Sequence, residues 1–157
     1  LAIEPAEKSV MQRPPYPPRE NIFGRGMARD ILWIGLLMGL VSLGVGFLYY
    51  RIDPSASPAV WQTVTFTTLT LAQMGNALAT RSDRDTLWQI GLSSNKAMLG
   101  SVLLTFALQM AVIYVPFLNR AFSTTPLSLR DLLISLGFGT IVFFAVELFK
   151  WIRQRQK

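Results

Sequence analysis

The stretch ILWIGLLMGLVSLGVGFLYY, residues 31–50, contains 20 consecutive residues without a charge. About 20 apolar residues carry an α-helix across the hydrocarbon core of a bilayer. Three further uncharged runs follow, at 54–80, 97–119 and 132–146. Backbone groups in lipid must be hydrogen-bonded within their own segment, so each run is expected to be helical. The sequence therefore predicts an all-α fold, an integral membrane bundle of four transmembrane helices. We place these helices at about 30–50, 60–80, 97–117 and 130–152.

The basic residues alternate between the segments that flank these helices. Of the 15 Lys and Arg residues, 12 fall in residues 1–30, in 81–96 or after 149, and 3 fall in the other two links. This is the positive-inside pattern, and it predicts a multi-pass protein with both termini in the cytoplasm. The net charge of +6 is shared among several membrane-flanking ends. A nucleic-acid-binding protein gathers such charge on one face, so we expect no nucleic-acid partner.

Residues 1–30 differ in composition from residues 31–157. Four prolines lie within positions 14–18, and proline favours an extended or polyproline-like backbone. We interpret 1–30 as a cytoplasmic Pro-rich loop, either a stiff linker or a strut that docks on another part of the same protein. Residues 31–157 are interpreted as the four-helix transmembrane domain. Because the chain starts with Leu1, we expect it to be a piece of a longer protein.

Several classes of functional site are absent from the sequence. There is no cysteine and no histidine, which excludes disulfides and any zinc or haem site built on Cys and His clusters. A glycine-rich phosphate loop, a nucleophile elbow and a pair of carboxylates within the apolar runs are also missing. We therefore expect no catalytic residue and no cofactor in this chain.

The segment 60–80 is unusually polar for an uncharged run. At 100° per residue, five polar side chains fall within about 60° of one line on a helix. They are Gln62, Thr70, Gln73, Asn76 and Thr80. A bare amide in hydrocarbon costs on the order of several kcal/mol, so a polar stripe faces protein or water rather than lipid. Two interpretations stay open: hydrogen bonding between helices, or the lining of an ion path.

Small residues in the first helix indicate close helix packing. Gly35 and Gly39 form a GxxxG arrangement, which lets the backbone of another helix approach closely. That helix belongs either to this bundle or to a part of the protein outside this chain. In the segment 97–117, the amide of Gln109 is expected to have a packing role.

The last segment ends in residues that are typical of a membrane interface. Glu147 and Lys150 are spaced i, i+3 and can pair there, while Trp151 fits the aromatic belt. We interpret these three residues as interface anchors. A proton-relay role for Glu147 is not favoured, because Glu147 lies near the end of its span.

Four stretches of the chain occur in a set order: EPAEKSVMQRPPYPPRENIF, FTTLTLAQMGNALATRS, NKAMLGSVLLTFALQMAVIYVPFLNRAF and PLSLRDLLISLGFGTIVFFAVELFKWIRQR. Together they resemble the C-terminal membrane region of P-type ATPases in the calcium-pump branch. The first is similar to the loop before their seventh helix. The others are similar to their eighth, ninth and tenth helices. The resemblance covers essentially the whole chain.

The resemblance implies that this chain is the C-terminal membrane support, helices seven to ten, of an ATP-driven cation pump, with calcium as the expected ion. Its partners would be the remaining domains of the same pump, the lipid bilayer and a divalent cation. ATP and Mg²⁺ are expected for the parent protein and not for this chain. Gly35 and Gly39 would pack on the long fifth helix, and Asn76 would make a structural hydrogen bond.

Gln73 matches a position at which two-ion calcium pumps of the sarcoplasmic type have a glutamate. Glutamine keeps a carbonyl oxygen but loses the negative charge that calcium prefers. Gln73 is therefore a candidate metal-contacting residue whose charge loss predicts one divalent ion per cycle.

The alternative to a pump fragment is an independent four-helix membrane protein, such as a regulatory subunit or a small transporter. A proton-driven transporter would want a carboxylate in the middle of the membrane, and none is found. The tail carries no retention signal of eukaryotic style, which favours a bacterial plasma membrane.

Overall fold

The computed structural model describes residues 27–52, 57–80, 91 and 95–155 of the chain. All regular structure in these residues is helical, as predicted. The helices are α1 (Met27–Ile52), α2 (Pro58–Ala79), α4 (Lys96–Tyr114), α5 (Pro116–Phe122) and α6 (Leu129–Arg155). Most of the expected Pro-rich loop lies outside the described residues.

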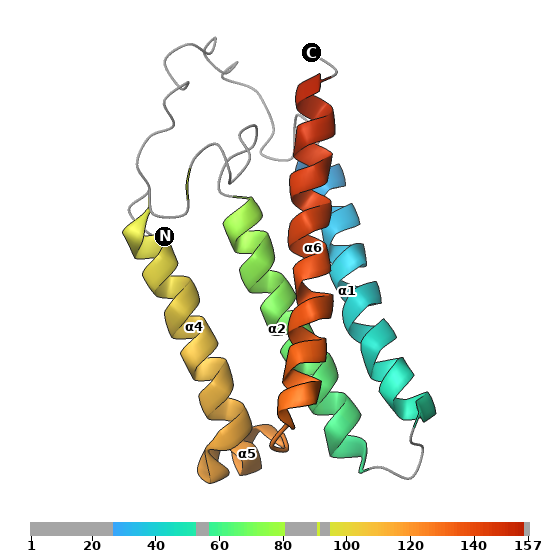
Figure 1. Cartoon of the computed structure of the whole chain (residues 1–157), viewed down its shortest axis with the longest axis vertical. Helices are drawn as coiled ribbons and strands as arrows, with labels where there is room; N and C mark the ends of the chain where they lie inside the picture. The colour runs from blue at the N-terminus through green and yellow to red at the C-terminus, as the bar shows by residue number, and fades with distance from the viewer. Residues whose placement is uncertain (1–26, 53–56, 81–90, 92–94, 156–157) are drawn as a thin grey trace.

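The four long helices alternate in direction along the chain (Figure 1). The start of α1, the end of α2, the start of α4 and the end of α6 lie at one end of the molecule, which we call the basic end. Arg29, Lys96, Arg153 and Arg155 belong to this end. The opposite end, called the far end, contains α5, the end of α1 and the starts of α2 and α6. α2 and α6 therefore run parallel to each other, and α1 and α4 run the other way.

Local sequence signals explain where the helices begin. Ser57 accepts a hydrogen bond from the Ala59 amide at the start of α2, and Pro58 occupies the first turn, where proline is favoured. Asn95 accepts from the Met98 amide at the start of α4. Ser128 and Asp131 bond reciprocally before α6, a capping box.

The helix expected at about 97–117 is interrupted just before Pro116. α4 stops at Tyr114 and the short α5 begins at Pro116, because proline has no amide hydrogen to donate to the carbonyl of Val112. The side chain of Asn119 replaces it and donates to the carbonyls of Val112 and Ile113, at 2.8 and 2.6 Å. Asn119 therefore caps the C-terminal end of α4 and holds α5 against it, so the chain forms a corner between the two helices.

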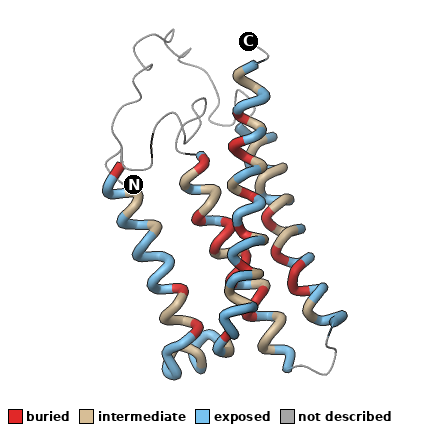
Figure 2. Tube along the Cα trace, viewed as in Figure 1, coloured by how far each residue is buried: buried red, intermediate tan, exposed pale blue. Residues whose placement is uncertain are grey.

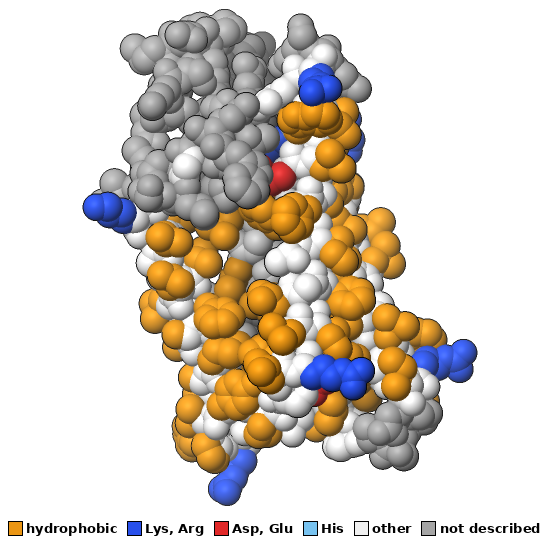
Figure 3. Space-filling view, in the orientation of Figure 1, with side chains coloured by type: hydrophobic (Ala, Val, Ile, Leu, Met, Phe, Trp, Pro, Cys, Tyr) orange, Lys and Arg blue, Asp and Glu red, His pale blue; other side chains and the backbone are white. Residues whose placement is uncertain are grey.

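Three described helices, α1, α4 and α6, are long and apolar enough to cross a membrane. α2 has 22 residues but does not meet the same criterion, because its Thr, Gln and Asn residues lower its hydropathy. The four predicted spans are thus shown as helices, of which three qualify as spans. Figure 3 shows hydrophobic side chains over the middle of one face and Lys and Arg near the two ends.

The core lies between α1, α2 and α6, and α2 is the central element. Buried positions of α1, α2 and α6 face one another, whereas most of α4 is exposed (Figure 2). One core cluster, nearer the basic end, contains Met38, Ala72, Ala79, Val142 and Val146. A second cluster, nearer the far end, contains Val45, Val64, Ile113 and Leu127.

Candidate functional site

The threonines of α2 are mostly satisfied within their own helix. Thr63, Thr65, Thr68, Thr70 and Thr80 each donate to the carbonyl four residues earlier, at 2.6–3.0 Å. Such bonds let hydroxyl groups sit in an apolar setting at little cost. The hydroxyl hydrogens of these five threonines are therefore used locally, although their oxygens can still accept hydrogen bonds.

The predicted stripe on α2 lies largely on an uncovered face of the bundle. Gln62, Gln73 and Thr80 are exposed and Thr70 is half-buried, because α1 and α6 pack on the other side of the helix. Among the described residues, the amide of Gln73 makes no hydrogen bond. Hydrogen bonding among the described helices therefore does not account for Gln73.

Asn76 sits at the edge of this stripe and is half-buried. Its Oδ1 atom is buried and has no hydrogen-bond partner in the part of the chain that the structure describes. The structural hydrogen bond expected of Asn76 is thus not made by this oxygen here. Its backbone carbonyl instead accepts from the amide and hydroxyl of Thr80.

Gln73 lines a hollow of about 310 Å³ between α2 and α4. The lining residues are Thr70, Gln73, Met74, Ala77, Met98, Ser101, Val102 and Thr105. Ser101 and Thr105 donate to carbonyls of their own helix. Among the lining residues, the amide of Gln73 is therefore the side chain that keeps a donor unused by the described residues, while the hydroxyl oxygens can still accept.

The chemistry of this hollow is neutral. Its oxygen atoms are amide, hydroxyl and carbonyl oxygens, and no carboxylate lines it. Nowhere in the described residues do three or more His, Cys, Asp or Glu side chains gather as metal ligands. A divalent ion prefers charged oxygen ligands, so the described residues offer Gln73 as one neutral ligand and do not complete a site around it.

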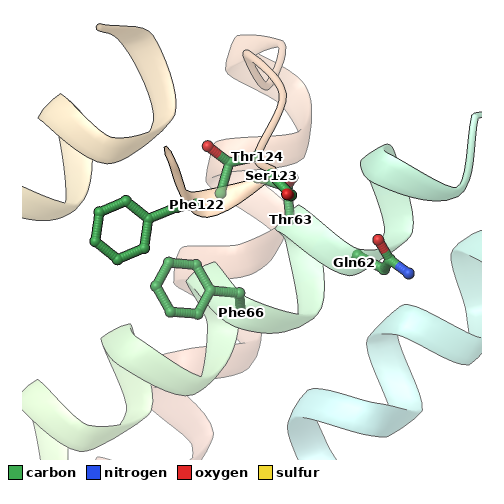
Figure 4. Close-up of a pocket in the computed structure, with 6 residues that line it drawn as sticks. All are labelled: Gln62, Thr63, Phe66, Phe122, Ser123 and Thr124. Atoms are coloured by element: carbon green, nitrogen blue, oxygen red, sulfur yellow. The ribbon is translucent and has the colours of Figure 1, made fainter. Parts of the chain in front are cut away.

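A second hollow, of about 220 Å³, lies near the far end between α2 and the corner after α5. Phe66 and Phe122 flank one side of it, and the amide of Gln62 points away from them (Figure 4). Thr63 accepts from the amide of Thr125 at 3.0 Å, and Thr124 donates to the carbonyl of Val112. These hydroxyls already hold the corner after α5 against α2 and α4. We therefore assign this hollow a structural role and not a ligand-binding one.

Gln109, expected to have a packing role, is the amide that joins two helices. It is buried on α4 and donates to the Thr67 hydroxyl on α2 at 3.2 Å. Thr67 is fully buried and accepts this bond with its hydroxyl oxygen. The sequence had pointed to Gln73 and Asn76 for this role, since those amides share a stripe.

The glycines predicted to pack are not the ones in close contact here. A Cβ atom added at Gly35 or Gly39 would meet nothing within 4 Å. The close approaches are instead at Gly46, where a Cβ would overlap the Thr65 hydroxyl, and between α2 and α6. There a Cβ at Gly139 would lie 2.9 Å from the Leu71 Cβ. The described residues thus leave open space beside Gly35 and Gly39, and the packing partner of these two glycines stays a prediction.

The predicted anchors lie at the basic end. Glu147 and Lys150 pair at 3.3 Å, as the i, i+3 spacing predicts, but both are buried, at 5% and 7% exposed. Lys150 also donates to the carbonyl of Ala79, the last residue of α2. Trp151 is exposed, and the Arg155 guanidinium lies over its ring, 3.8 Å from the ring centre.

Two long-range contacts were not predicted from the sequence. Arg153 lies 3.5 Å from Asp30 and joins α6 to α1 at the basic end. Tyr49 donates to Asp131 at 2.7 Å and joins the same two helices at the far end. No local pattern marks either pair, because the partners are more than 80 residues apart.

Comparison with known proteins gives a match over nearly the whole chain. Residues 1–152 match the family model described as cation transporting ATPase, C-terminus. The chain is 35% identical to human calcium-transporting ATPase type 2C member 2 over 152 residues, 96% of this chain and 16% of that protein. It is 34% identical to calcium-transporting ATPase type 2C member 1 of Pongo abelii, over 100% of this chain and 17% of that protein.

A yeast relative agrees with these matches. The chain is 30% identical to calcium-transporting ATPase 1 of Saccharomyces cerevisiae, over 100% of this chain and 16% of that protein. The chain thus spans about one sixth of the length of these relatives. They come from animals and yeast, and so lend no support to the expected bacterial membrane.

Proposed function

Because the chain belongs to the family of C-terminal regions of cation-transporting ATPases, in the calcium-pump branch of the P-type ATPases, we propose that it is the membrane support of an ATP-driven calcium pump. In this role it buttresses the transport helices of the same polypeptide. ATP with Mg²⁺ would bind in parts of the parent that this chain does not include.

The observation that carries this proposal is the uncovered polar face of α2. Gln62 and Gln73 are exposed on a helix whose neighbours have the length and hydropathy of membrane spans. An amide left bare in hydrocarbon costs on the order of several kcal/mol. Other protein must therefore cover this face, and the remaining five-sixths of the parent is the natural source of that cover.

We also propose that α2 is the fourth span. Its polar residues are tolerable in a membrane because α1 and α6 bury its opposite face and the transport helices would cover the stripe. Both termini would then be cytoplasmic, as the distribution of basic residues indicates. Single cysteines placed at Ser82, outside the described residues, and at Ser123 should react with an impermeant reagent from opposite faces. Labelling from one face would contradict four spans.

Gln73 bears on how many ions the parent carries. A neutral amide can orient one oxygen at an ion but contributes far less Coulomb attraction than a carboxylate in a low-dielectric site. We therefore propose one divalent ion per cycle, calcium first and manganese as the lesser possibility.

The experiment uses the full-length parent in membrane vesicles. We expect calcium-activated ATP hydrolysis and one calcium bound per phosphorylated enzyme. Gln73→Ala should shift the half-activating calcium concentration by less than about tenfold, or roughly 1.4 kcal/mol. Gln62→Ala is the matched control, since it removes an exposed amide from the same face. A wild-type ratio near two that falls to one in Gln73→Ala would show that Gln73 completes a second site.

The alternative, an independent four-helix protein, makes a different prediction about size. An epitope tag at the C-terminus should detect one polypeptide several times longer than this chain, and that band should form a calcium-dependent phosphorylated intermediate. A product of about 17.6 kDa that carries the tag in native membranes would favour the alternative.

A further inference from the structure

The C-terminal end of α2 is held by a buried charge from another helix. The last carbonyls of a helix have no partner within the helix. At the end of α2, the carbonyl of Asn76 accepts from Thr80, whereas the carbonyl of Ala79 accepts from the ammonium of Lys150 on α6. A cation at this position also interacts favourably with the helix dipole. We call Lys150, Glu147 and the Ala79 carbonyl the α2–α6 clamp.

The burial of this clamp is unusual for its residue types. The side chains of Lys150 and Glu147 are only 8% and 6% exposed, although Lys and Glu are almost never buried unless paired. A buried ion pair contributes little stability compared with apolar residues of the same volume. What it does supply is directionality, because the hydrogen bond to Ala79 exists at one relative position of the two helices.

The rest of the α2–α6 contact is apolar. A Cβ at Gly139 would meet Leu71, and one at Gly75 would meet Phe143, so each helix places a glycine against a large side chain of the other. In lipid, apolar packing between helices competes with equally apolar chains. The clamp adds a directional polar contact at the basic end, which holds α2 at this axial position.

The axial position of α2 decides where its polar stripe sits. Gln73 lies six residues before Ala79, about 9 Å along the helix axis at 1.5 Å per residue. No proline lies between these residues, so the helix has no kink there to absorb a displacement. A shift at Ala79 is therefore passed on to Gln73.

We propose that Lys150 is a positioning residue that fixes α2 axially against α6 and thereby sets the cation affinity of the parent pump at the Gln73 face. The inference rests on the proposed function, since it needs a cation site beside α2. Lys150 itself touches neither the ion nor Gln73.

The test uses the full-length parent in membrane vesicles, with Lys150→Met to remove the charge and keep an unbranched chain. We expect the half-activating calcium concentration to rise severalfold, but by no more than in Gln73→Ala, because Lys150 acts through the position of Gln73 as residues that orient metal ligands do. The maximal rate should change less than twofold. Lys150→Arg keeps a donor and should restore part of the affinity. Arg155→Met, an exposed cation of the same helix, is the control and should leave the affinity unchanged.

A second readout measures helix position without using activity. A Cβ at Gly75 would lie 3.2 Å from the Cβ of Phe143, close to the separation in a disulfide. Gly75→Cys with Phe143→Cys, in a parent stripped of its other cysteines, should cross-link on oxidation. Cleavage at a protease site introduced at Ser123 reports whether the halves stay joined. We expect Lys150→Met to lose this cross-link and Arg155→Met to keep it.

Each outcome decides a different part of the proposal. An unchanged cross-link in Lys150→Met overturns the positioning role, and a lost cross-link with unchanged calcium affinity overturns the link to the cation. Should Lys150→Met fold poorly because Glu147 is left buried, the double variant Glu147→Gln, Lys150→Met removes both charges and should show the same two losses. A wild type without calcium activation would refute the proposed function, while the cross-link would still test the clamp.

Discussion

Two helices, α6 and α4, pack on α2 in different ways although both are long and apolar enough to cross a membrane. α6 runs parallel to α2 and contacts it along its length, from Gly139 to Lys150. α4 reaches α2 mainly near the far end, and its buried residues are Gln109 and Ile113. In consequence a larger share of α6 than of α4 is buried within the structure. Hydropathy thus identifies a membrane helix without telling whether lipid or protein covers it.

The largest expected effect breaks the α2–α6 contact. Gly139→Leu places a side chain where a Cβ alone would lie 2.9 Å from Leu71 and 3.3 Å from the backbone of Ala72. Overpacking of this kind costs up to about 3 kcal/mol in the free energy of unfolding. Gly137→Leu is the control, because a Cβ there meets nothing within 4 Å. The thermal stability of the parent in detergent, followed by fluorescence-detected chromatography, should fall for Gly139→Leu alone. Equal stability of the two variants would mean that α2 and α6 are farther apart than described.

An intermediate effect tests the surface of α1 that this chain leaves open. Gly39 has free space beside it here, but the resemblance places another helix of the parent against it. Gly39→Leu should therefore lower the stability of the full-length parent by about 1 kcal/mol, at the low end of overpacking costs. Gly44→Leu, on the opposite side of α1 with nothing within 4 Å, is the matched change. If both variants are as stable as wild type in the same chromatographic assay, Gly39 faces lipid.

The smallest effect concerns the single side-chain hydrogen bond from α4 to α2. Thr67→Val, Gln109→Leu and the double variant form a double-mutant cycle for the contact at 3.2 Å. Interhelical hydrogen bonds in membranes contribute about 0.6 kcal/mol on average, and we expect a coupling of that size in equilibrium unfolding of the parent. A coupling of zero would show that α4 is held at the far end by the Asn119 corner and apolar contacts alone.

Much of the helical architecture can be predicted from the sequence because interactions between residues close in sequence determine it. Long uncharged runs predict the four long helices, and Ser57, Asn95 and Ser128 mark the starts of three of them. The threonine bonds within α2 and the Glu147–Lys150 pair follow from spacings of four and three residues. Each of these features needs only neighbours within about one helical turn.

The tertiary structure decided which of several equivalent residues make contacts. Periodicity places Gly35, Gly39 and Gly46 on one face of α1, but only the last approaches another helix in this chain. The sequence likewise offers several amides for joining helices, and Gln109 rather than Gln73 does so.

The burial of Lys150 under the end of α2 also depends on a residue 71 positions away in the sequence. The physical reason is that lipid and protein interior are both apolar. The sequence of a membrane helix therefore gives little indication of which apolar face packs against which neighbouring helix. That choice is made when the helices pack, and it sets both the contact at Gly139 and the exposure of Gln73.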